Sequence, residues 1–246
     1  MTISKREDLK ALRTKKKRQR RMNTLFGVGA FIVIVILVLI SPTIYNQFQP
    51  AGNFVRITPI ARPDVNGKTL GSPNAKVKIL VFEDFQCPIC KEFTNSVEPQ
   101  LDASTYITSG QVSYTFMQFP FIDDNSLTKE SHQASNASMC ALEQGRFWDY
   151  HDILFANQGT ENGGSFNNKR LQAFAESLGL NMTQFNQCFN ADKFSAEIEA
   201  DYQQGVSMGV TGTPTVFVNG TVVTPGYAPT WAELKAAIDT ALAGGG

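Results

Sequence analysis

The stretch FEDFQCPIC, residues 82–90, decides how the middle of this chain folds. It closes an apolar run, 76–85, that is typical of a buried strand. Pro88 then stands where the first turn of a helix would begin, a position at which its missing N–H costs nothing. Cys87 and Cys90 flank that turn. Two cysteines at this spacing can ligate a metal, close a structural disulfide, or exchange disulfides with other thiols.

The predicted position of Cys87, at the start of a helix, favours disulfide exchange. Unpaired backbone N–H groups and the helix dipole stabilise a thiolate there. The thiolate is the nucleophile of the exchange reaction, and such sites lower a cysteine pKa from about 8.5 to roughly 3.5–7.5. Cys90 lies one turn further along, where it can attack a mixed disulfide and release the product. The pair can therefore act as a nucleophilic and a resolving cysteine.

A zinc site is the competing interpretation of the cysteines. Zinc usually takes four nitrogen or sulfur ligands, often in two close pairs. Cys140 and Cys188 are 48 residues apart and neither has a neighbouring cysteine. His132 and His151 do not have the spacing of a ligand pair either. We therefore expect no metal and no cofactor, and we interpret both histidines as ordinary helix residues, with His151 partly packed against its aromatic neighbours.

The charges of the chain are divided unevenly. Residues 1–21 carry ten Lys or Arg side chains against Glu7 and Asp8, whereas the remainder has twelve basic and twenty acidic side chains. A nucleic-acid-binding domain would carry its positive charge on the folded face, so this distribution argues against nucleic acid as a partner. It suggests a basic tail that stays near anionic lipid.

The apolar run LFGVGAFIVIVILVLI, residues 25–40, follows the tail, and the charge-free stretch continues to Tyr45. A membrane-spanning helix needs roughly 17–25 such residues. No A-x-A-like cleavage site follows it, so the run predicts an uncleaved signal anchor over 24–45. The positive-inside rule then places the tail, 1–23, in the cytoplasm, with Tyr45 at the far interface of this single pass through the cell membrane. A cleaved secretory signal is the alternative, and either way the rest of the chain is expected outside the cytoplasm.

Residues 46–75 contain four prolines and several glycines and are expected to form a linker that leads into the domain. The helix after Pro88 is expected to end near Leu101. The remaining elements are predicted in this order: a strand at 111–119, a helical block at about 126–208, a β-hairpin at 215–223 around Asn219-Gly220, and a last helix that begins near Trp231. This order of strands and helices is that of an α/β domain.

A second signal lies far from the cysteine pair. The stretch MGVTGTPTVFVNG, residues 208–220, places Pro214 just before the predicted hairpin. A proline after Thr213 at the start of a strand favours a cis bond, which costs an X–Pro pair only about 0.5–1 kcal/mol.

Three segments together resemble the DsbA-like thioredoxin-fold disulfide oxidoreductases: CPIC after a strand, CALEQGRFWDYHDILF at 140–155, and GVTGTPTVFVNG at 209–220. The resemblance covers roughly residues 68–244. It implies a thioredoxin fold over 76–246, with the helical block inserted as a cap over the active site. The whole chain is then an α/β protein preceded by one transmembrane helix.

The resemblance also implies roles for individual residues. Cys87 corresponds to the exposed nucleophile and Cys90 to the resolving cysteine. Pro214 corresponds to a cis-proline that packs beside the pair, and the backbone of Thr213 corresponds to the edge that pairs with a substrate peptide by strand addition.

Some relatives carry a second, structural disulfide in the helical block, where Cys140 and Cys188 lie. The resemblance therefore implies a structural bridge between them, and two free buried thiols are the alternative.

The sequence departs from the family pattern at two positions. Ile89 stands where the best-known relatives have a histidine, and Val81 stands where many members have a buried acid. Glu83 shares strand parity with Val81, so it is a candidate proton acceptor for Cys90. A solvent-facing carboxylate at the strand end is the alternative. These departures leave the direction of electron flow open.

The resemblance implies a thiol:disulfide oxidoreductase that acts on exported cysteine-containing proteins and is reoxidised by a membrane redox partner, and the predicted signal anchor attaches it to the membrane. An oxidase is favoured because isomerases of this kind usually add a dimerisation domain, for which residues 46–75 are too short and too rich in proline. The alternatives are a dedicated reductase for one client and a non-enzymatic tethered domain whose cysteines form structural disulfides only.

Overall fold

The computed structural model describes residues 3–48 and 51–244, with the side chains of 16–38, 51–124 and 126–244. Residues 1–2 of the predicted tail and 49–50 of the predicted linker lie outside this description. The chain divides into two units, Met1–Tyr45 and Asn46–Gly246.

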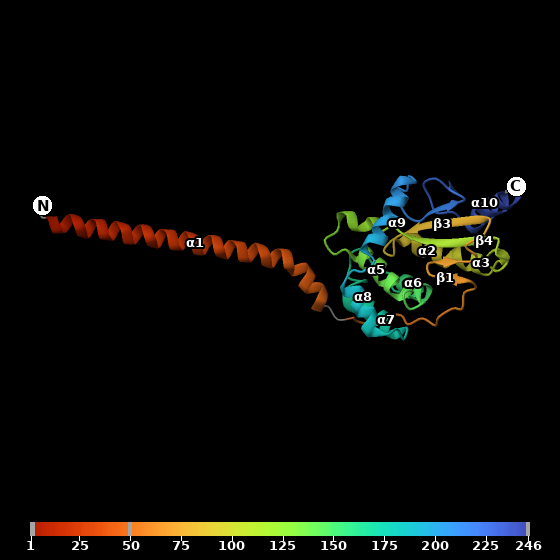
Figure 1. Cartoon of the computed structure of the whole chain (residues 1–246), viewed down its shortest axis with the longest axis horizontal. Helices are drawn as coiled ribbons and strands as arrows, with labels where there is room; N and C mark the ends of the chain where they lie inside the picture. The colour runs from red at the N-terminus through yellow and green to blue at the C-terminus, as the bar shows by residue number, and fades with distance from the viewer. Residues whose placement is uncertain (1–2, 49–50, 245–246) are drawn as a thin grey trace. The chain divides into compact units, whose positions relative to one another are not determined.

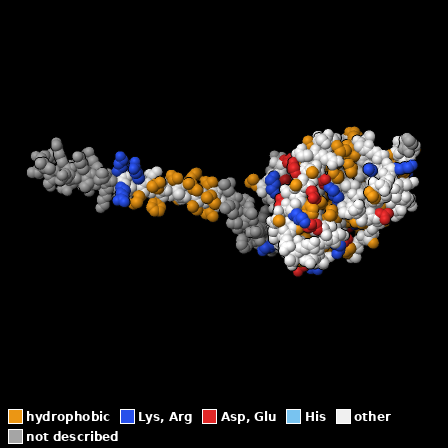
Figure 2. Space-filling model, in the orientation of Figure 1, with side chains coloured by type: hydrophobic (Ala, Val, Ile, Leu, Met, Phe, Trp, Pro, Cys, Tyr) orange, Lys and Arg blue, Asp and Glu red, His pale blue; other side chains and the backbone are white. Residues whose placement is uncertain are grey.

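Helix α1, Ile3–Phe48, runs through the basic tail and the apolar run. Its segment Lys16–Val38 has a mean hydropathy of 2.1 and is long and apolar enough to cross a membrane, by length and composition only. Figure 2 shows Lys and Arg side chains at one end of this segment and hydrophobic side chains along the rest. Phe26 is 76% exposed, as expected of a side chain that has no protein core to enter. The predicted interfacial side chain of Tyr45 lies outside the described residues.

The described part of the second unit contains a sheet with the strand order β1-β2-β4-β3-β5-β6 (Figure 1). The central strands β3 and β4 are parallel, and every other neighbouring pair is antiparallel. The strands are β1 Val65–Asn66, β2 Thr69–Leu70, β3 Val77–Glu83, β4 Val112–Gln118, β5 Thr215–Val218 and β6 Thr221–Val222. The cysteine pair follows β3, so it lies at the end of a strand in the middle of the sheet.

Helices connect and cover these strands. The crossover from β3 to β4 contains α2 Pro88–Ser96, α3 Glu98–Asp102 and α4 Thr105–Thr108. The helical block follows β4 with the 3-10 helix η1 Phe121–Asn125 and the helices α5 Glu130–Leu142, α6 Phe147–Ala156, α7 Asn168–Ser177, α8 Met182–Asn190 and α9 Ser195–Ser207, and α10 Trp231–Gly244 follows the hairpin. This arrangement confirms the predicted thioredoxin fold with inserted helices.

The side chains of β3 alternate between the two faces of the sheet, as those of any strand do. Val81 and Glu83 point to the face that belongs to the larger hydrophobic core, together with side chains of α2 and α10. Phe82 points to the other face and packs edge-on against Phe119, with ring centroids 6.1 Å apart. Tyr202 of α9 stacks on Phe119 there. Glu83 is therefore a carboxyl group on the face that also receives the cysteine helix.

The helix after Pro88 is shorter than the sequence predicted. It ends at Ser96 instead of continuing to Leu101, and α3 begins at Glu98. The cause is Pro99 in the first turn of α3, because proline cannot donate the helical hydrogen bond to the preceding turn and its ring clashes with that carbonyl.

Residues 46–75, predicted as a linker and domain lead-in, contain two structured parts that the sequence did not indicate. Strands β1 and β2 form a hairpin around Gly67, whose φ of 61° suits glycine, and the hairpin buries Leu70 against the sheet. Residues 51–63 form a strap over the helical block. In this strap Val55 exchanges two hydrogen bonds with Asn157, of 2.7 and 2.8 Å. Proline and glycine content indicated a loop but carried no information about these distant contacts.

Candidate active site

Cys87 directly precedes α2 and is separated from the end of β3 by residues 84–86. It caps the N-terminus of α2 with an extended backbone, and Pro88 occupies the first helical turn. The sulfur of Cys87 donates a hydrogen bond to the carbonyl oxygen of Thr213, at 3.2 Å and 126 residues away in sequence. The bond between Thr213 and Pro214 is cis. The structure therefore brings Cys87 together with the loop that the sequence singled out far along the chain.

Both cysteines of the motif are free thiols, and both are buried. Cys87 is 5% exposed and Cys90 is 0% exposed. The resemblance implied an exposed Cys87, and this expectation is wrong because the carbonyl group of Thr213 lies against the sulfur. Ile89, between the two cysteines, is 48% exposed, so the motif meets solvent through an apolar side chain.

The two thiols differ in acidity. The pKa of Cys87 is lowered to about 6, chiefly by a hydrogen bond from the Cys90 thiol. Burial acts in the opposite direction and raises this pKa. Thr213 and the N–H groups at the start of α2 lower it further. The pKa of Cys90 is raised, first by burial and then by its bond to Cys87 and the charge of Glu83. At neutral pH Cys87 is therefore largely a thiolate, the reactive form, whereas Cys90 keeps its proton.

Glu83 is fully buried on β3, opposite Gln118 of β4 in the strand register. Among the residues that the structure describes, neither of its carboxyl oxygens has a hydrogen-bond partner. The pKa of Glu83 is raised, first by burial and then by the charges of Glu98 and Cys87. The neighbouring Cys90 lowers this pKa but does not outweigh the other causes. The alternative of a solvent-facing carboxylate is therefore wrong. Glu83 is instead a buried carboxyl group near the cysteine pair, with a pKa above its ordinary value.

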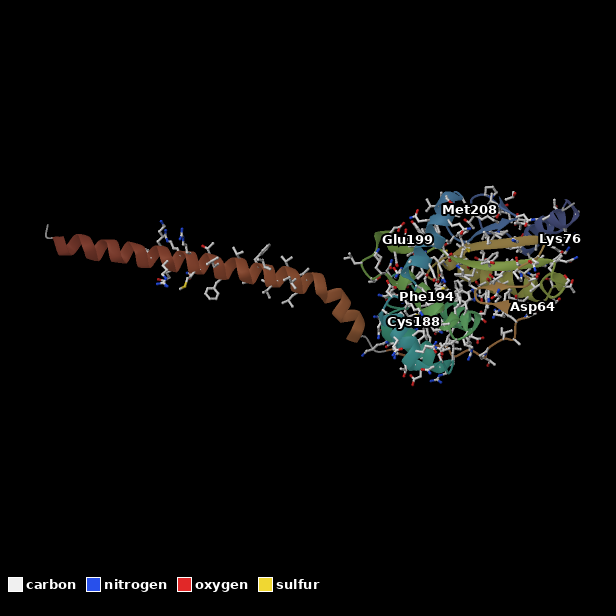
Figure 3. The ribbon with its side chains drawn as sticks, in the orientation of Figure 1. Asp64, Lys76, Cys188, Phe194, Glu199 and Met208 are labelled. Carbon is white, nitrogen blue, oxygen red and sulfur yellow. A yellow bond between two sulfur atoms is a disulfide. The ribbon has the colours of Figure 1, made fainter. Side chains whose placement is uncertain are left out.

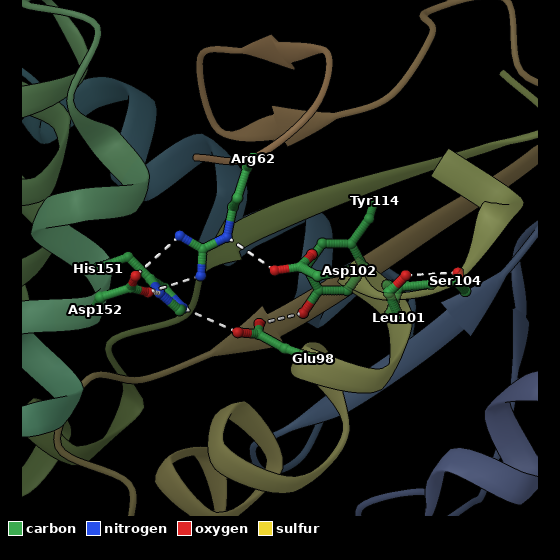
Figure 4. Close-up of polar contacts among 8 residues, drawn as sticks. All are labelled: Arg62, Glu98, Leu101, Asp102, Ser104, Tyr114, His151 and Asp152. Carbon is green, nitrogen blue, oxygen red and sulfur yellow. Dashed lines mark hydrogen bonds and ion pairs between the residues drawn. The ribbon is translucent and has the colours of Figure 1, made fainter. Parts of the chain in front are cut away.

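A buried polar cluster surrounds Glu98 (Figure 4). Tyr114 of β4 donates a hydrogen bond of 2.6 Å to one carboxyl oxygen of Glu98. Nε2 of His151, on α6, lies 3.8 Å from the other oxygen. His151 is fully buried among aromatic rings, and its Nδ1 lies 3.0 Å from Asp152. The interpretation of His151 as an ordinary helix residue, partly packed against aromatic neighbours, did not include its contacts with Glu98 and Asp152.

Arg62 reaches this cluster from the strap. It forms a two-pronged contact with Asp152, with N···O distances of 2.9 and 3.0 Å, and a third bond of 3.1 Å to Asp102. Burial alone would lower the pKa of Arg62, but the two aspartates outweigh burial and raise it. The guanidinium is therefore a permanent positive charge at the outer end of the cluster.

One sequence signal could have pointed to Glu98. Cys90, Thr94 and Glu98 recur every four residues, a spacing that puts side chains on one face of a helix. No local pattern could have indicated Arg62, because its contacts with Asp102 and Asp152 join residues 40 and 90 positions apart.

Asp84 is a second buried acid that the sequence did not single out. Its carboxyl group accepts hydrogen bonds from Ser131 at 2.6 Å, from the Gln86 N–H at 2.8 Å and from the Ile122 N–H at 3.1 Å. Burial raises the pKa of Asp84 to about 7, against these bonds. The contacts fasten the segment before Cys87 to the helical block, so they hold the cysteine turn in place.

Cys140 of α5 and Cys188 of α8 form a disulfide. Both are buried, at 0% and 4% exposure. Cys188 lies in the helical block (Figure 3). The bridge corresponds to the pairing that the resemblance implied and differs from the alternative of two free thiols.

A groove of about 610 Å³ runs beside the Thr213–Pro214 loop. Ile89 of the cysteine motif, Phe217 of β5 and Tyr227 contribute to its lining. Tyr227 is 58% exposed, so a large aromatic side chain is available to a bound peptide. The groove places apolar surface next to the backbone edge that the sequence predicted to bind substrate.

Comparison with known proteins agrees with this geometry. The sequence model of the thioredoxin family matches residues 64–240. A probable disulfide bond formation protein D from Bacillus anthracis is 27% identical, over 89% of this chain and 97% of the relative. The crystal structure of oxidised BdbD from Bacillus subtilis superposes with a TM-score of 0.64 at 26% identity and covers 78% of this chain and 100% of that one. The oxidised Mtb DsbA structure has a TM-score of 0.58 at 27% identity, over 72% of this chain and 93% of that chain.

The family match extends over most of the chain, and both solved structures share its fold. The chain therefore belongs to the DsbA-like branch of the thioredoxin family and is a thiol:disulfide oxidoreductase.

Proposed function

We propose that this protein is a membrane-anchored oxidase that introduces disulfides into exported proteins through the Cys87–Cys90 pair. The observation that carries the proposal is the position of Cys87 at the start of α2 and against the Thr213–Pro214 loop, where its pKa is lowered to about 6. A thiolate exists only in the reduced pair, so stabilising it favours reduction of the enzyme and oxidation of the substrate. The relative from Bacillus anthracis, named for disulfide bond formation, supports the same direction.

The first step joins substrate and enzyme. A substrate thiolate attacks the sulfur of Cys87 in the oxidised pair, a new S–S bond forms, and the bond between Cys87 and Cys90 breaks. The electron pair of that bond goes to Cys90. Because burial raises the pKa of Cys90, its thiolate takes up a proton. Glu83, whose pKa is raised well above its usual value, is the candidate donor of that proton.

The second step releases the product. A second substrate thiolate attacks the substrate sulfur of the mixed disulfide, and Cys87 leaves as a thiolate. A thiol of low pKa leaves faster, so the pKa of about 6 that favours reduction also favours release. The substrate has then lost two electrons, and the enzyme holds them as the reduced pair. A membrane redox partner removes these electrons, and Glu83 accepts the proton that Cys90 gives up.

The Thr213–Pro214 loop is the proposed substrate edge. When Cys87 is protonated, its sulfur donates a hydrogen bond to the Thr213 carbonyl. Neither the thiolate nor the disulfide form of Cys87 has this proton, so in both forms the carbonyl is free to accept a backbone N–H of an extended substrate peptide. The neighbouring groove, with Phe217 and Tyr227, would receive apolar side chains on either side of the substrate cysteine.

Helix α1 is the proposed anchor. Its segment Lys16–Val38 has the length and composition of a membrane span, and its basic residues precede the apolar ones. The positive-inside rule then places the N-terminus in the cytoplasm and the enzyme domain outside. An oxidising compartment is also where a structural bridge such as Cys140–Cys188 persists.

A refolding assay tests the proposal. The oxidised full-length protein in detergent micelles is mixed with a reduced, unfolded protein of several cysteines, and recovery of that protein's native activity is followed. We expect rapid oxidation by the wild type and none by Cys87→Ser. If the protein instead reduces insulin disulfides quickly and does not oxidise the test protein, the alternative of a dedicated reductase is correct.

A further inference from the structure

Gln158, just after helix α6, is joined to the turn at Cys87, residues 84–88, by three hydrogen bonds. Its side-chain amide donates two of them, of 2.7 Å to the backbone carbonyl of Phe85 and of 2.8 Å to that of Cys87. Its own backbone carbonyl accepts the third, of 3.3 Å, from Nζ of Lys91 in α2. Gln158 lies 67 to 73 residues after these partners in the sequence. It therefore connects a distant part of the chain with both sides of the turn.

The two carbonyls that Gln158 contacts are those at which regular structure is interrupted. Phe85 follows β3 and precedes α2, so its carbonyl belongs to neither a strand ladder nor a helix. Phe85 is fully buried, and a buried carbonyl without a donor is costly. The Cys87 carbonyl accepts the first bond of α2, from the Lys91 N–H at 3.2 Å, and has a second lone pair for the Gln158 amide. Gln158 thus stabilises the backbone where α2 begins.

The same turn determines which groups face the sulfur of Cys87. Cys87 is the N-cap of α2, a position whose side chain lies near the unpaired N–H groups of the second and third helical residues. In α2 these are the N–H groups of Ile89 and Cys90. The pKa of Cys87 is lowered first by the Cys90 thiol, and Thr213 and these N–H groups lower it further. The donors that meet the sulfur therefore depend on the backbone that Gln158 holds.

The end of α6 is itself fixed, so the Gln158 amide is held in position. Asn157, the residue before Gln158, exchanges hydrogen bonds of 2.7 and 2.8 Å with the backbone of Val55 in the strap. The ring of Phe155 packs against the ring of Phe85, with centroids 5.2 Å apart. A donor that is already in place loses little conformational freedom when it forms its bonds.

We propose that Gln158 is a positioning residue for disulfide exchange, which fixes the turn at Cys87 so that the N–H groups at the start of α2 stay directed at its sulfur. The inference rests on the part of the proposed function that makes Cys87 the nucleophile. Gln158 acts through the backbone, because the groups that it contacts are carbonyls and the Lys91 ammonium. Negative charge that develops on the sulfur during exchange then meets donors that are already oriented.

The first test removes the donor from Gln158 in the reduced full-length protein in detergent micelles. Gln158→Met keeps the length of the side chain but donates no hydrogen bond, and Gln158→Ala removes the contact altogether. We expect alkylation of Cys87 by iodoacetamide at pH 5 to slow by about two- to tenfold in both variants, the factor to which a typical hydrogen bond corresponds. At pH 9 the rate should stay near that of the wild type, because Cys87 is a thiolate there in each protein. The midpoint of the pH profile therefore moves upward.

The equilibrium of the Cys87–Cys90 pair with glutathione gives a second measurement. A less stabilised thiolate raises the free energy of the reduced pair, so both Gln158 variants should be weaker oxidants than the wild type. We expect the equilibrium constant to shift toward the disulfide form by about two- to tenfold. A role of Gln158 in global stability alone would leave this constant unchanged in the folded protein.

Gln144 offers a matched control. It is also a glutamine whose side chain bonds to the backbone of a distant segment, at 3.3 Å to the carbonyl and 2.8 Å to the N–H of Asn181. Asn181 is the N-cap of α8, in the helical block. Gln144→Met should therefore keep the wild-type pH midpoint of Cys87 and the wild-type equilibrium with glutathione.

The outcomes separate this inference from the proposed function. If folded Gln158→Met has the wild-type pH midpoint and the wild-type glutathione equilibrium, Gln158 does not position Cys87, and the oxidase proposal stands. If Gln144→Met shifts the midpoint as far as Gln158→Met does, the shift reflects a general loss of packing and the inference is also wrong. If the Gln158 variants shift both measurements but the wild type oxidises no substrate protein, the inference holds and the proposed direction of the reaction is wrong.

Discussion

The molecule contains two cysteine pairs, and burial does not distinguish them. Cys87 and Cys90 are 5% and 0% exposed, and Cys140 and Cys188 are 0% and 4% exposed. The first pair is a dithiol and the second is a disulfide. What differs is the surroundings. The first pair lies at a helix start beside the carboxyl group of Glu83, whereas the second joins two helices of the block.

This difference shows how one side chain serves two purposes. Around Cys87 the neighbouring thiol and the N–H groups of α2 stabilise negative charge, so the sulfur is a ready nucleophile and a good leaving group. The bridge of Cys140 closes a loop of 48 residues and restricts the unfolded chain. Reactivity thus follows from neighbouring charges and donors, and stabilisation follows from the length of the closed loop.

The largest expected effect separates the two pairs by activity. Cys87→Ser should lower disulfide exchange by at least about a hundredfold, because the remaining free thiol, Cys90, is fully buried and has a raised pKa. Cys90→Ser should instead accumulate mixed disulfides through Cys87, visible on non-reducing gels. If Cys87→Ser traps substrates and Cys90→Ser does not, Cys90 is the nucleophile and the roles assigned to the two cysteines are wrong.

The next effect separates them by stability. The double variant Cys140→Ala, Cys188→Ala should lose roughly 4 kcal/mol of unfolding free energy, within a usual range of about 0 to 5, because the long loop is no longer closed. Chemical denaturation of the oxidised full-length protein measures this. Exchange activity per folded molecule should stay at the wild-type level. An equally large loss of specific activity would make the bridge part of the redox path.

A smaller effect comes from the pKa of Cys87. In the reduced protein this pKa is about 6, below the ordinary value of 9.0, so the thiolate adds stability that is full above pH 9 and is lost as the pH falls through 6. The oxidised protein has no such group. The free energy of unfolding of the reduced protein should therefore rise, relative to that of the oxidised protein, by roughly 1 kcal/mol between pH 5 and pH 7, after allowance for solvent screening. If the difference in unfolding free energy between the reduced and oxidised proteins does not change with pH, Cys87 is not a stabilised thiolate.

Local signals were enough to predict much of the fold. The apolar run before Cys87, the proline at the helix start and the Asn219-Gly220 turn each act within a few residues, and the hairpin forms with φ of 49° and 80° at those two positions. Pro99 shows the limit of this approach, because its position divides a helix that apolar periodicity alone would continue.

Distant contacts could not be predicted in the same way. Arg62 was assigned to a linker because nothing near it in sequence indicates Asp152, which lies 90 residues away. Glu83 had the correct strand parity, but whether a strand-end carboxyl group is buried depends on helices that follow much later. The cover over Cys87 likewise comes from Thr213, 126 residues on.

The reduction potential of the Cys87–Cys90 pair tests the central claim most directly. The full-length protein is equilibrated in glutathione buffers of graded ratio, and mass mapping follows each pair separately. A stabilised Cys87 thiolate predicts a potential toward about −120 mV, the value of a strong oxidant, with Cys140–Cys188 still closed at that point. A potential near about −270 mV, or reduction of the Cys140–Cys188 bridge first, would contradict the account.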